Sequence, residues 1–469
     1  MTDVRIERDP LGELPVPATA LYGIQTERAR LNFPISGLVP LPIFVDAMVW
    51  IKKAAALTHR DTGRLPARLA DAIVRAADEV LGGQHRDQFV VDPFQAGAGT
   101  SHNMNVNEVL ANRANELLGG TRGAYAPVHP NDHVNMAQST NDTIPTAMRL
   151  AALAELPALL AGLDTLEAAL LDRGRAFDDV IKSGRTHLQD ATPIRLGQEF
   201  TAYGRTIARN RARVTAAAAA LGELNIGGTA VGTGLNAEPT YPARMVQHLR
   251  AMTGLDLREG ADRVQLMQSM GDQAAFSGAL RTGALDLSKI ANDIRLLASG
   301  PRTGLNEIAL PAVQPGSSIM PGKVNPSIAE MVNMVCYQVV GCDTTVALSA
   351  EAGQLELNVM MPVIAHNLLF AMGILGNAAR VFGERCIRGV EANRTQCAYW
   401  LERSPALVTA LAPHIGYARA AALAKEAIAL DRTVRDLVIE RGVLPGDEVD
   451  RVLDLRAMTE LGVPGAPRV

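Results

Sequence analysis

The spacing of proline residues constrains the fold of this chain more than any other feature of its sequence. Four long intervals contain no proline: residues 194–238, 243–300, 327–361 and 363–404. A proline inside an α-helix costs about 3 kcal/mol, because it lacks an N–H group and its ring clashes with the preceding turn. The four intervals therefore leave room for unusually long helices.

Apolar residues repeat with the period of a helix in the same part of the chain. Steps of three or four residues separate two sets, which are Leu150, Leu153, Leu156, Leu160, Leu163, Leu166 and Leu170, and Leu287, Ile290, Ile294 and Leu297. Such spacing places each set on one helical face, and Pro157 should kink the first helix. Strand signals are scarce, since aromatic residues make up only 4% of the sequence. We therefore predict an all-α protein built around a bundle of long helices.

The pattern divides the chain into three predicted domains. Residues 1–139 hold shorter helices and Pro/Gly turns, residues 140–394 hold the long-helix bundle, and residues 395–469 form a small, more charged domain. The long helices exceed what one small core can cover. We therefore expect some of their faces to be buried against other subunits.

Charge, hydropathy and cysteine usage exclude several classes of protein. The net charge is −4 and the pI is about 6.2, which argues against a nucleic-acid-binding surface. No uninterrupted apolar run approaches the ~20 residues of a membrane span, and the N-terminus MTDVRIERDP is too charged for a signal peptide. The four cysteines form no CxxC pair and no zinc-ligand spacing with histidine, so they read as buried thiols. We expect a cytoplasmic protein without a membrane or nucleic-acid partner.

Four polar stretches interrupt the helical pattern: GAGTS (97–101), QSTND (138–142), GRTHLQDATP (184–193) and GSSIMPGKVNP (316–326). Each precedes a predicted helix start. Thr192 before Pro193 is typical of an N-cap followed by proline, and Ser327 with Glu330 is typical of a capping box. Taken singly, such hydroxyls usually cap helices and do nothing else.

Together the four stretches indicate a site for an anion. Helix N-termini carry free N–H groups and a partial positive charge, and Lys323 would add a full charge. A small dicarboxylate is the ligand that fits this set. His187, in a polar turn, is a candidate for acid–base chemistry or hydrogen bonding, although a lone histidine is more often structural.

Two stretches resemble nucleotide-binding motifs but do not match them. GSSIMPGKV has five residues between its glycines where a P-loop has four, and Val324 stands where a P-loop has Ser or Thr. GGTAVGTG (227–234) follows an alanine-rich helical stretch and no strand, which argues against a dinucleotide site.

GSSIMPGKVNP resembles the signature loop of the fumarase/aspartase superfamily. GAGTSHNMNVNEVLAN, NDHVNMAQSTND, GRTHLQDATPIRLGQEF, GGTAVGTGLN and GQLELNV resemble further blocks of that superfamily, in the same order and over nearly the whole chain. The resemblance implies an all-helical, three-domain fold. It also implies a homotetramer with a twenty-helix core and active sites shared between subunits.

The resemblance also implies a reaction, the anti elimination of a succinate derivative to give fumarate, without a metal or organic cofactor. Ser317 would be the base, as an alkoxide, on a loop that closes over the substrate. His187 and Asn141 would hold the leaving group. The remaining predicted substrate-binding residues are Thr100, Ser101, Ser139, Thr140, Thr186, Ser318, Lys323 and Asn325.

Several substrates stay open. GAGTS, NDHVN, QSTND and EAGQLELNVM are more similar to aspartate ammonia-lyases, with Thr140 the most telling residue, whereas GRTHLQDATP and VHPND are similar to class II fumarases. We favour L-aspartate, with fumarate hydration as the alternative. His102 and Met361 differ from the superfamily pattern, which keeps a substituted aspartate open. A non-catalytic helical scaffold is the remaining hypothesis, ranked last because the polar groups of the site are intact.

Overall fold

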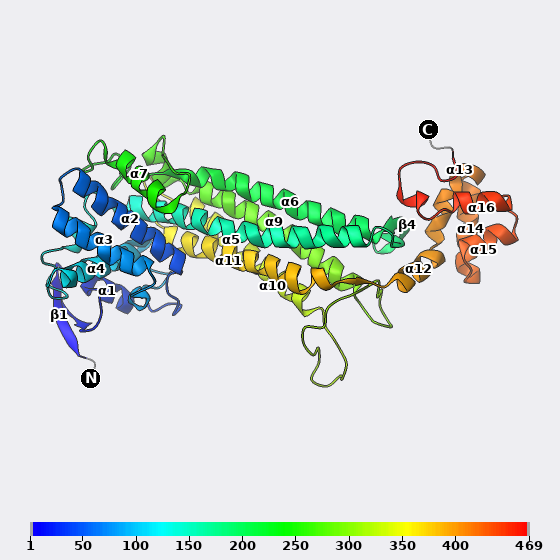
Figure 1. Cartoon of the computed structure of the whole chain (residues 1–469), viewed down its shortest axis with the longest axis horizontal. Coiled ribbons are helices and arrows are strands. Elements are labelled where there is room, and N and C mark those ends of the chain that lie inside the picture. Colours follow the sequence, from blue (N-terminus) through cyan, green and yellow to red (C-terminus); the bar gives the residue numbers. More distant parts are fainter. Residues whose placement is uncertain (1–2, 467–469) are drawn as a thin grey trace. The chain divides into compact units, whose positions relative to one another are not determined.

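The computed structural model describes residues 3–466, which fold into two compact units that share the long helices (Figure 1). The first unit comprises Met1–Leu160, Ala212–Ala284 and Cys336–Gly376. The second comprises Ala161–Arg211, Leu285–Val335 and Asn377–Val469. Each unit is described by itself below. The division into three domains stays a prediction.

Five long helices dominate the chain: α5 (Thr140–Ala176), α6 (Leu196–Ala218), α9 (Gly271–Leu297), α10 (Ser327–Glu351) and α11 (Met361–Arg385). Four of them lie in the proline-free intervals, with Pro362 tolerated in the first turn of α11 because the N–H groups there need no intrahelical partner. α5 continues through Pro145 and Pro157. The predicted all-α fold with long helices is confirmed.

The apolar repeats lie where a helical period should put them. On α9, Leu287, Ile290, Ile294 and Leu297 are all buried. On α5 the predicted set is buried at Leu150, Leu163, Leu166 and Leu170 and half-buried at Leu153, Leu156 and Leu160. The four cysteines are free and buried, as expected. Burial raises the pKa of the Cys336 thiol to about 12, so it stays protonated and inert.

Shorter helices build the rest of the first unit. They are α1 (Ile24–Asn32), α2 (Pro42–Asp61), α3 (Ala67–Leu81), α4 (Thr100–Leu117), α7 (Tyr241–Thr253) and α8 (Arg263–Gln268). α2 packs against α3 and α7, and α4 against α1 and α3. These contacts hold in place the start of α4, where the GAGTS block lies.

The strands in the described residues are short and pair only in twos. The antiparallel pairs are β1 (Val4–Asp9) with β2 (Gly12–Pro17), β3 (Ile181–Thr186) with β4 (Gln189–Arg195), and β7 (Ile308–Ala309) with β8 (Glu391–Ala392). β5 (Glu223–Leu224) and β6 (Arg258–Glu259) are parallel. The β3–β4 hairpin corrects one prediction, because Thr192 and Pro193 lie in β4 and the helix begins only at Leu196.

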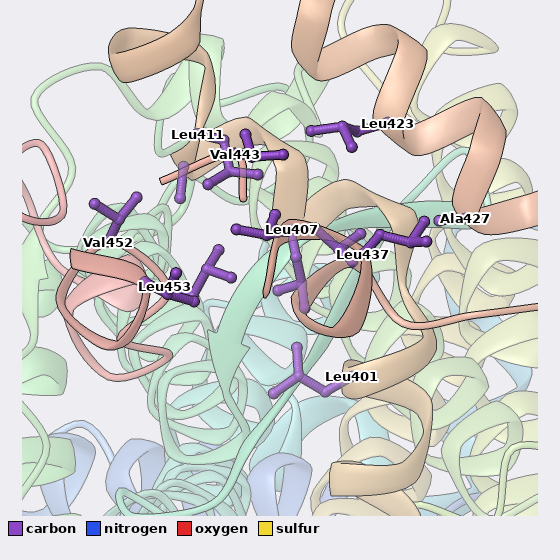
Figure 2. Close-up of a cluster of buried hydrophobic side chains, with 13 residues drawn as sticks. Leu401, Leu407, Leu411, Leu423, Ala427, Leu437, Val443, Val452 and Leu453 are labelled. Carbon is purple, nitrogen blue, oxygen red and sulfur yellow. The ribbon is translucent and has the colours of Figure 1, made fainter. Parts of the chain in front are cut away.

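The C-terminal helices in the second unit enclose an apolar cluster of their own (Figure 2). These helices are α12 (Arg394–Arg403), α13 (Ala412–Ile415), α14 (Tyr417–Leu430), α15 (Val434–Glu440) and α16 (Gly446–Val452). Leu411, Val438, Val452 and Leu437 are among its most buried members. The cluster gives this short, charged segment a core despite its composition.

Three helices are long and apolar enough to cross a membrane by length and composition alone, namely Thr140–Ala176, Ser327–Glu351 and Met361–Gly389. The sequence prediction considered only uninterrupted apolar runs and did not anticipate them. Within the protein, 56% of the apolar window is buried in the first and third of these helices, but only 39% in the second. α10 therefore leaves most of its apolar window uncovered in a single chain.

Candidate active site

The GAGTS block forms a tight turn that opens α4. Ala98 has a φ of 60° and Gly99 a φ of 86°, both left-handed, and Thr100 is the first helical residue. A Cβ atom at Gly99 would lie 2.8 Å from the Ile144 side chain, so the turn requires glycine on both counts. The Thr100 side chain is exposed, whereas Ser101 is only 6% exposed. Of the two predicted hydroxyls, Thr100 is the one presented at the helix end.

The QSTND block opens α5 with reciprocal capping. The Asp142 Oδ1 atom accepts from the N–H of Ser139 at 2.9 Å, and the Ser139 hydroxyl oxygen accepts from the N–H of Asn141 at 3.2 Å. This is the capping arrangement that polar residues at spacing three produce. The Asn141 amide donates to the Ala230 carbonyl at 2.8 Å, which joins this block to the glycine-rich segment 227–234.

Asp142 also fixes that glycine-rich segment. Its Oδ2 atom accepts hydrogen bonds from the N–H groups of Gly227 and Thr229, each at 3.0 Å. Complete burial raises the pKa of this carboxyl to about 7, while the three N–H donors and Lys52 act in the opposite direction. The GGTAVGTG segment therefore serves as backbone support for the N-terminus of α5.

Two contacts join the remaining blocks of the first unit to these helix ends. The Asn103 amide on α4 donates to the Thr140 hydroxyl on α5 at 3.2 Å. The N–H of Ala98 donates to the Val359 carbonyl of the GQLELNV block at 2.7 Å. Four blocks far apart in the sequence thus converge in one unit, and they bring together the predicted residues Thr100, Ser101, Ser139, Thr140 and Asn141.

Thr186 and His187 lie at the tip of the β3–β4 hairpin in the second unit. His187 and Leu188 form its two-residue turn with φ values of 55° and 59°, which is a type I′ turn made without glycine or asparagine. Thr186, His187 and Leu188 are all exposed. The predicted helix N-terminus is absent from this block, so it offers side chains and no helix dipole.

A buried ionic cluster holds the base of this hairpin. Glu307 is fully buried and accepts from Arg185 at 2.9 Å, and it pairs with Lys182 at 3.2 Å. Lys182 also donates to Glu199 at 2.9 Å. Breaking such a cluster would leave buried charges unpaired, so the four side chains hold the strand before His187 firmly in place.

GSSIMPGKVNP is an irregular loop, as predicted, and two hydrogen bonds close its base. The N–H of Gly316 donates to the Lys323 carbonyl, and the Asn325 amide donates to the Gly316 carbonyl, both at 2.8 Å. A Cβ atom at Gly316 would lie 2.7 Å from backbone atoms of Lys323 and Asn325. Only glycine fits this closure. Ser318 and Lys323 are exposed.

The Ser317 hydroxyl has the most informative geometry in the loop. Its oxygen accepts hydrogen bonds from the N–H groups of Ile319 at 3.2 Å and Met320 at 3.0 Å. Two N–H dipoles aimed at one oxygen stabilise negative charge on it.

The predicted capping box after this loop is wrong. Ser327 is the first residue of α10, and its buried hydroxyl has no hydrogen-bond partner. The N–H of Glu330 instead donates to the Pro326 carbonyl at 3.0 Å. The helix begins one residue too early for Ser327 to cap it.

His102, which differs from the superfamily pattern, is buried. It is 0% exposed and stacks on Phe44 with ring centroids 4.8 Å apart. Neither ring nitrogen makes a hydrogen bond of good geometry. Burial, together with the charge of Lys52, lowers the pKa of His102 to about 3, while the Phe44 backbone opposes the shift. The imidazole is therefore neutral.

Among the described residues 3–466, no group of three His, Cys, Asp or Glu side chains lies close enough together to hold a metal ion. The candidate residues of the two units, each taken by itself, are hydroxyls, amides, N–H groups and the exposed Lys323. This donor set matches a carboxylate ligand.

Comparison with known proteins identifies the family. Residues 12–341 match the family described as Lyase, and residues 407–460 match the family described as Fumarase C C-terminus. This chain belongs to the fumarase/aspartase superfamily. The match supports the resemblance noted in the sequence blocks.

Relatives of this superfamily member carry two different activities in their names. Aspartate ammonia-lyase of Bacillus subtilis (strain 168) is 49% identical over 464 residues, which cover 99% of this chain and 98% of the relative. Fumarate hydratase class II of Halobacterium salinarum is 52% identical over 462 residues, which cover 98% of each. Identity alone therefore does not choose between ammonia and water as the leaving group.

Solved structures agree on the fold. Fumarate lyase:delta crystallin from Brucella melitensis, crystallised bound to cobalt, has a TM-score of 0.95 at 49% identity and covers 98% of this chain and 100% of its own. Class II fumarase from Schistosoma mansoni has a TM-score of 0.93 at 38% identity, with 97% and 99% covered. Members of the superfamily act on small dicarboxylates.

Sequence reasoning missed two buried residues of this superfamily member, Lys52 on α2 and Asn103 on α4. Lys52 donates to the Asn103 side chain at 2.7 Å, and Asn103 bonds Thr140. A signal was present in the sequence. Lys52 falls in the helical register of Val45, Met48 and Ala55, where an apolar residue is the rule.

Proposed function

We propose that this superfamily member catalyses the reversible anti elimination of ammonia from L-aspartate to give fumarate. One observation carries the proposal: the Ser317 hydroxyl oxygen accepts two backbone N–H groups, from Ile319 and Met320. A serine must become an oxyanion before it can remove a proton from carbon, and donors of this kind stabilise that form. The QSTND block and the relatives named aspartate ammonia-lyase support L-aspartate as the substrate.

In the proposed step, the Ser317 alkoxide removes a proton from the methylene carbon of L-aspartate. The electron pair of that C–H bond moves into the neighbouring carboxylate, which becomes a dianionic aci-carboxylate. The pair then returns to form the C=C bond of fumarate as the C–N bond breaks and ammonia leaves. Stabilising the intermediate is the largest demand on the protein, since one well-placed donor typically contributes about 3 kcal/mol.

The other predicted residues divide by role. The carboxylate that takes up charge is held by Ser318, Thr100, Ser139 and Thr140, with Ser101 beside them. The second carboxylate is held by Lys323, Asn325 and Thr186. The leaving group is held by Asn141 and His187. The N-termini of α4 and α5 support these roles, because both present N–H groups and a positive partial charge near Thr100 and Thr140.

We further propose that the enzyme is a homotetramer in which different subunits complete each active site. The predicted residues divide between two units of the chain. α10 also carries an uncovered apolar face, on which Met334, Tyr337 and Leu348 are 68%, 62% and 67% exposed. Packing long helices of four chains into a twenty-helix core would cover such a face. The proposed chemistry needs no metal or organic cofactor, and the proposed location is the cytoplasm.

Two other substrates have specific support. Fumarate hydration, the reversible addition of water to give L-malate, is favoured by the 52% identity to a class II fumarate hydratase and by His187 in the GRTHLQDATP block. A substituted aspartate is favoured by His102 and by Met361, which is fully buried at the start of α11.

The decisive experiment measures the ratio of two activities. Purified enzyme is incubated with L-aspartate and with L-malate, and fumarate is followed by ultraviolet absorbance. We expect L-aspartate to be used at least about tenfold more efficiently, a difference of about 1.4 kcal/mol in transition-state binding. A ratio in favour of L-malate would replace this proposal with fumarate hydration.

A Ser317→Ala variant tests the base. Loss of a positioned base typically lowers turnover about 10²–10⁴-fold, and we expect a loss in this range with an unchanged circular dichroism spectrum. If Ser317→Ala were as active as the wild type on every succinate derivative, the base would be another residue. If the wild type used none of them, the scaffold hypothesis would replace the enzyme.

A further inference from the structure

Lys52 is a fully buried cation beneath the candidate site of the first unit. It is 0% exposed, and its ammonium donates to three side-chain amide oxygens: Asn103 at 2.7 Å, Asn135 at 2.9 Å and Gln138 at 3.0 Å. Burying a lysine without a carboxylate in contact is costly, and an apolar residue would pack this stripe of α2 more favourably. A purely structural role does not explain a charge at this position.

The hydrogen bonds require the charged form of Lys52. An ammonium has three N–H donors and no acceptor, whereas a neutral amine has two donors and one acceptor. All three partners are amide oxygens, so only the ammonium satisfies them. Burial lowers the pKa of Lys52 to about 7, and Asp142 opposes the shift. The lysine therefore changes charge near neutral pH, and its three amide acceptors favour the charged form.

Lys52, together with Asn135 and Thr143, fixes which way the Asn103 amide faces. Because the ammonium takes the Oδ1 atom, the NH₂ group of Asn103 points to Thr140 and donates to its hydroxyl oxygen at 3.2 Å. That oxygen is then an acceptor within the protein, and the Thr140 proton is left to donate elsewhere. An anionic ligand at the N-terminus of α5 is the partner that such a donor would bind.

One acidic group, Asp142, acts on Lys52, and its carboxyl opposes the fall in the pKa of the lysine. Asp142 accepts N–H groups from Ser139, Gly227 and Thr229, so its charge is spread over three donors. His102 is buried and neutral, as shown above. A positive charge in a water-free interior is screened weakly and acts over a longer distance than one at the surface.

We propose that Lys52 is a positioning residue for the dicarboxylate: its ammonium orients Asn103, and through it the Thr140 hydroxyl, and supplies a buried positive charge behind the N-termini of α4 and α5. This inference rests on the proposed function, since it assigns a ligand to the same helix ends. Lys52 itself touches no ligand.

The test compares two variants with a matched control. Lys52→Met removes the charge. Asn103→Asp keeps the shape of Asn103, gives Lys52 a carboxylate partner and removes the NH₂ group that orients Thr140. Lys53→Met removes the neighbouring lysine, which is partly exposed and paired with Asp78 of α3 at 2.5 Å. The readouts are the melting temperature and the dissociation constant for succinate, an unreactive dicarboxylate, measured by calorimetry.

We expect succinate to bind at least about tenfold more weakly to Lys52→Met and to Asn103→Asp, and within about twofold of the wild type to Lys53→Met. Asn103→Asp is the sharper variant. A merely structural Lys52 would gain an ion pair there, so the melting temperature would hold or rise. Unchanged succinate affinity in a folded Asn103→Asp protein would overturn the proposal, even if Lys52→Met failed to fold.

Turnover separates this inference from the proposed function. Suppose that the wild type binds succinate but converts neither L-aspartate nor L-malate, and that Asn103→Asp no longer binds succinate. This result would overturn the proposed function and keep the role of Lys52. A wild type that converts either substrate, with Asn103→Asp unchanged in KM and in succinate affinity, would keep the enzyme and reject the role of Lys52.

Discussion

Burial sets the protonation of the ionisable side chains beneath the GAGTS and QSTND blocks. Lys52, Asp142 and His102 are all fully buried. Burial lowers the pKa of Lys52 and of His102 and raises that of Asp142, which in each case favours the neutral form of the side chain. None of these shifts could be predicted from the sequence. A lysine or histidine inside a helical stretch is usually solvated, and only the packing of α2 against α4 and the turn before α5 places these groups in the interior.

His102 should make the protein sensitive to acid. Its ordinary pKa of 6.5 applies in the unfolded chain, while burial holds the folded value near 3. The unfolded chain therefore binds more protons between these values, and stability falls as the pH drops from 6.5 toward 3. Between pH 7 and pH 5 the loss from this residue is about 2 kcal/mol.

A His102→Met variant removes this titration. We expect its free energy of unfolding, measured with urea, to fall less between pH 7 and pH 5 than that of the wild type. At pH 7 it should be equal or slightly higher, because the two unpaired ring nitrogens are gone. Parallel curves for both proteins across this range would show that the imidazole is not held neutral.

At the scale of elements, the long helices were predictable and the hairpin was not. Proline spacing and apolar period act within one helix, so the sequence alone locates α9 and α10. The β3–β4 hairpin was missed because Thr192 and Pro193 imitate a helix start, and because its turn residues, His187 and Leu188, carry no glycine or asparagine. Glu307, over 100 positions away in the chain, pairs with Arg185 and Lys182 of strand β3 and so stabilises the hairpin that its turn residues do not predict.

The turn should be strained, and a glycine should relieve it. Leu188 is 71% exposed with a φ of 59°, a conformation that costs an L-residue about 1–2 kcal/mol. We expect Leu188→Gly to stabilise the protein by about 1 kcal/mol in chemical denaturation. Leu188→Ala is the matched control and should give no gain, since it keeps a Cβ atom. Equal effects of the two changes would mean that the exposed leucine, and not the backbone, sets the stability.

At the scale of the whole molecule, the order of the superfamily-like blocks can be read from the sequence, but their grouping in space cannot. Four blocks meet in the first unit through bonds such as Asn103 to Thr140, while the hairpin with His187 and the loop with Ser317 belong to the second. Contacts between residues far apart in the chain decide this grouping. The apolar face of α10 is exposed to solvent in a single chain, and association of several chains would cover it.

Mixing two inactive variants tests whether subunits share sites. Ser317→Ala removes the proposed base in the second unit, and Thr140→Val removes a carboxylate donor in the first. If each site takes these residues from different chains, random tetramers from equal co-expression contain both intact residues in about one quarter of their sites. We therefore expect co-expressed variants to recover about a quarter of wild-type activity, while each variant alone stays inactive. Recovery would require the site to be assembled between chains, because a site built within one chain always contains one of the two defects. No recovery in mixed tetramers, verified by separating differently tagged chains, would place Ser317 and Thr140 of each site on the same chain.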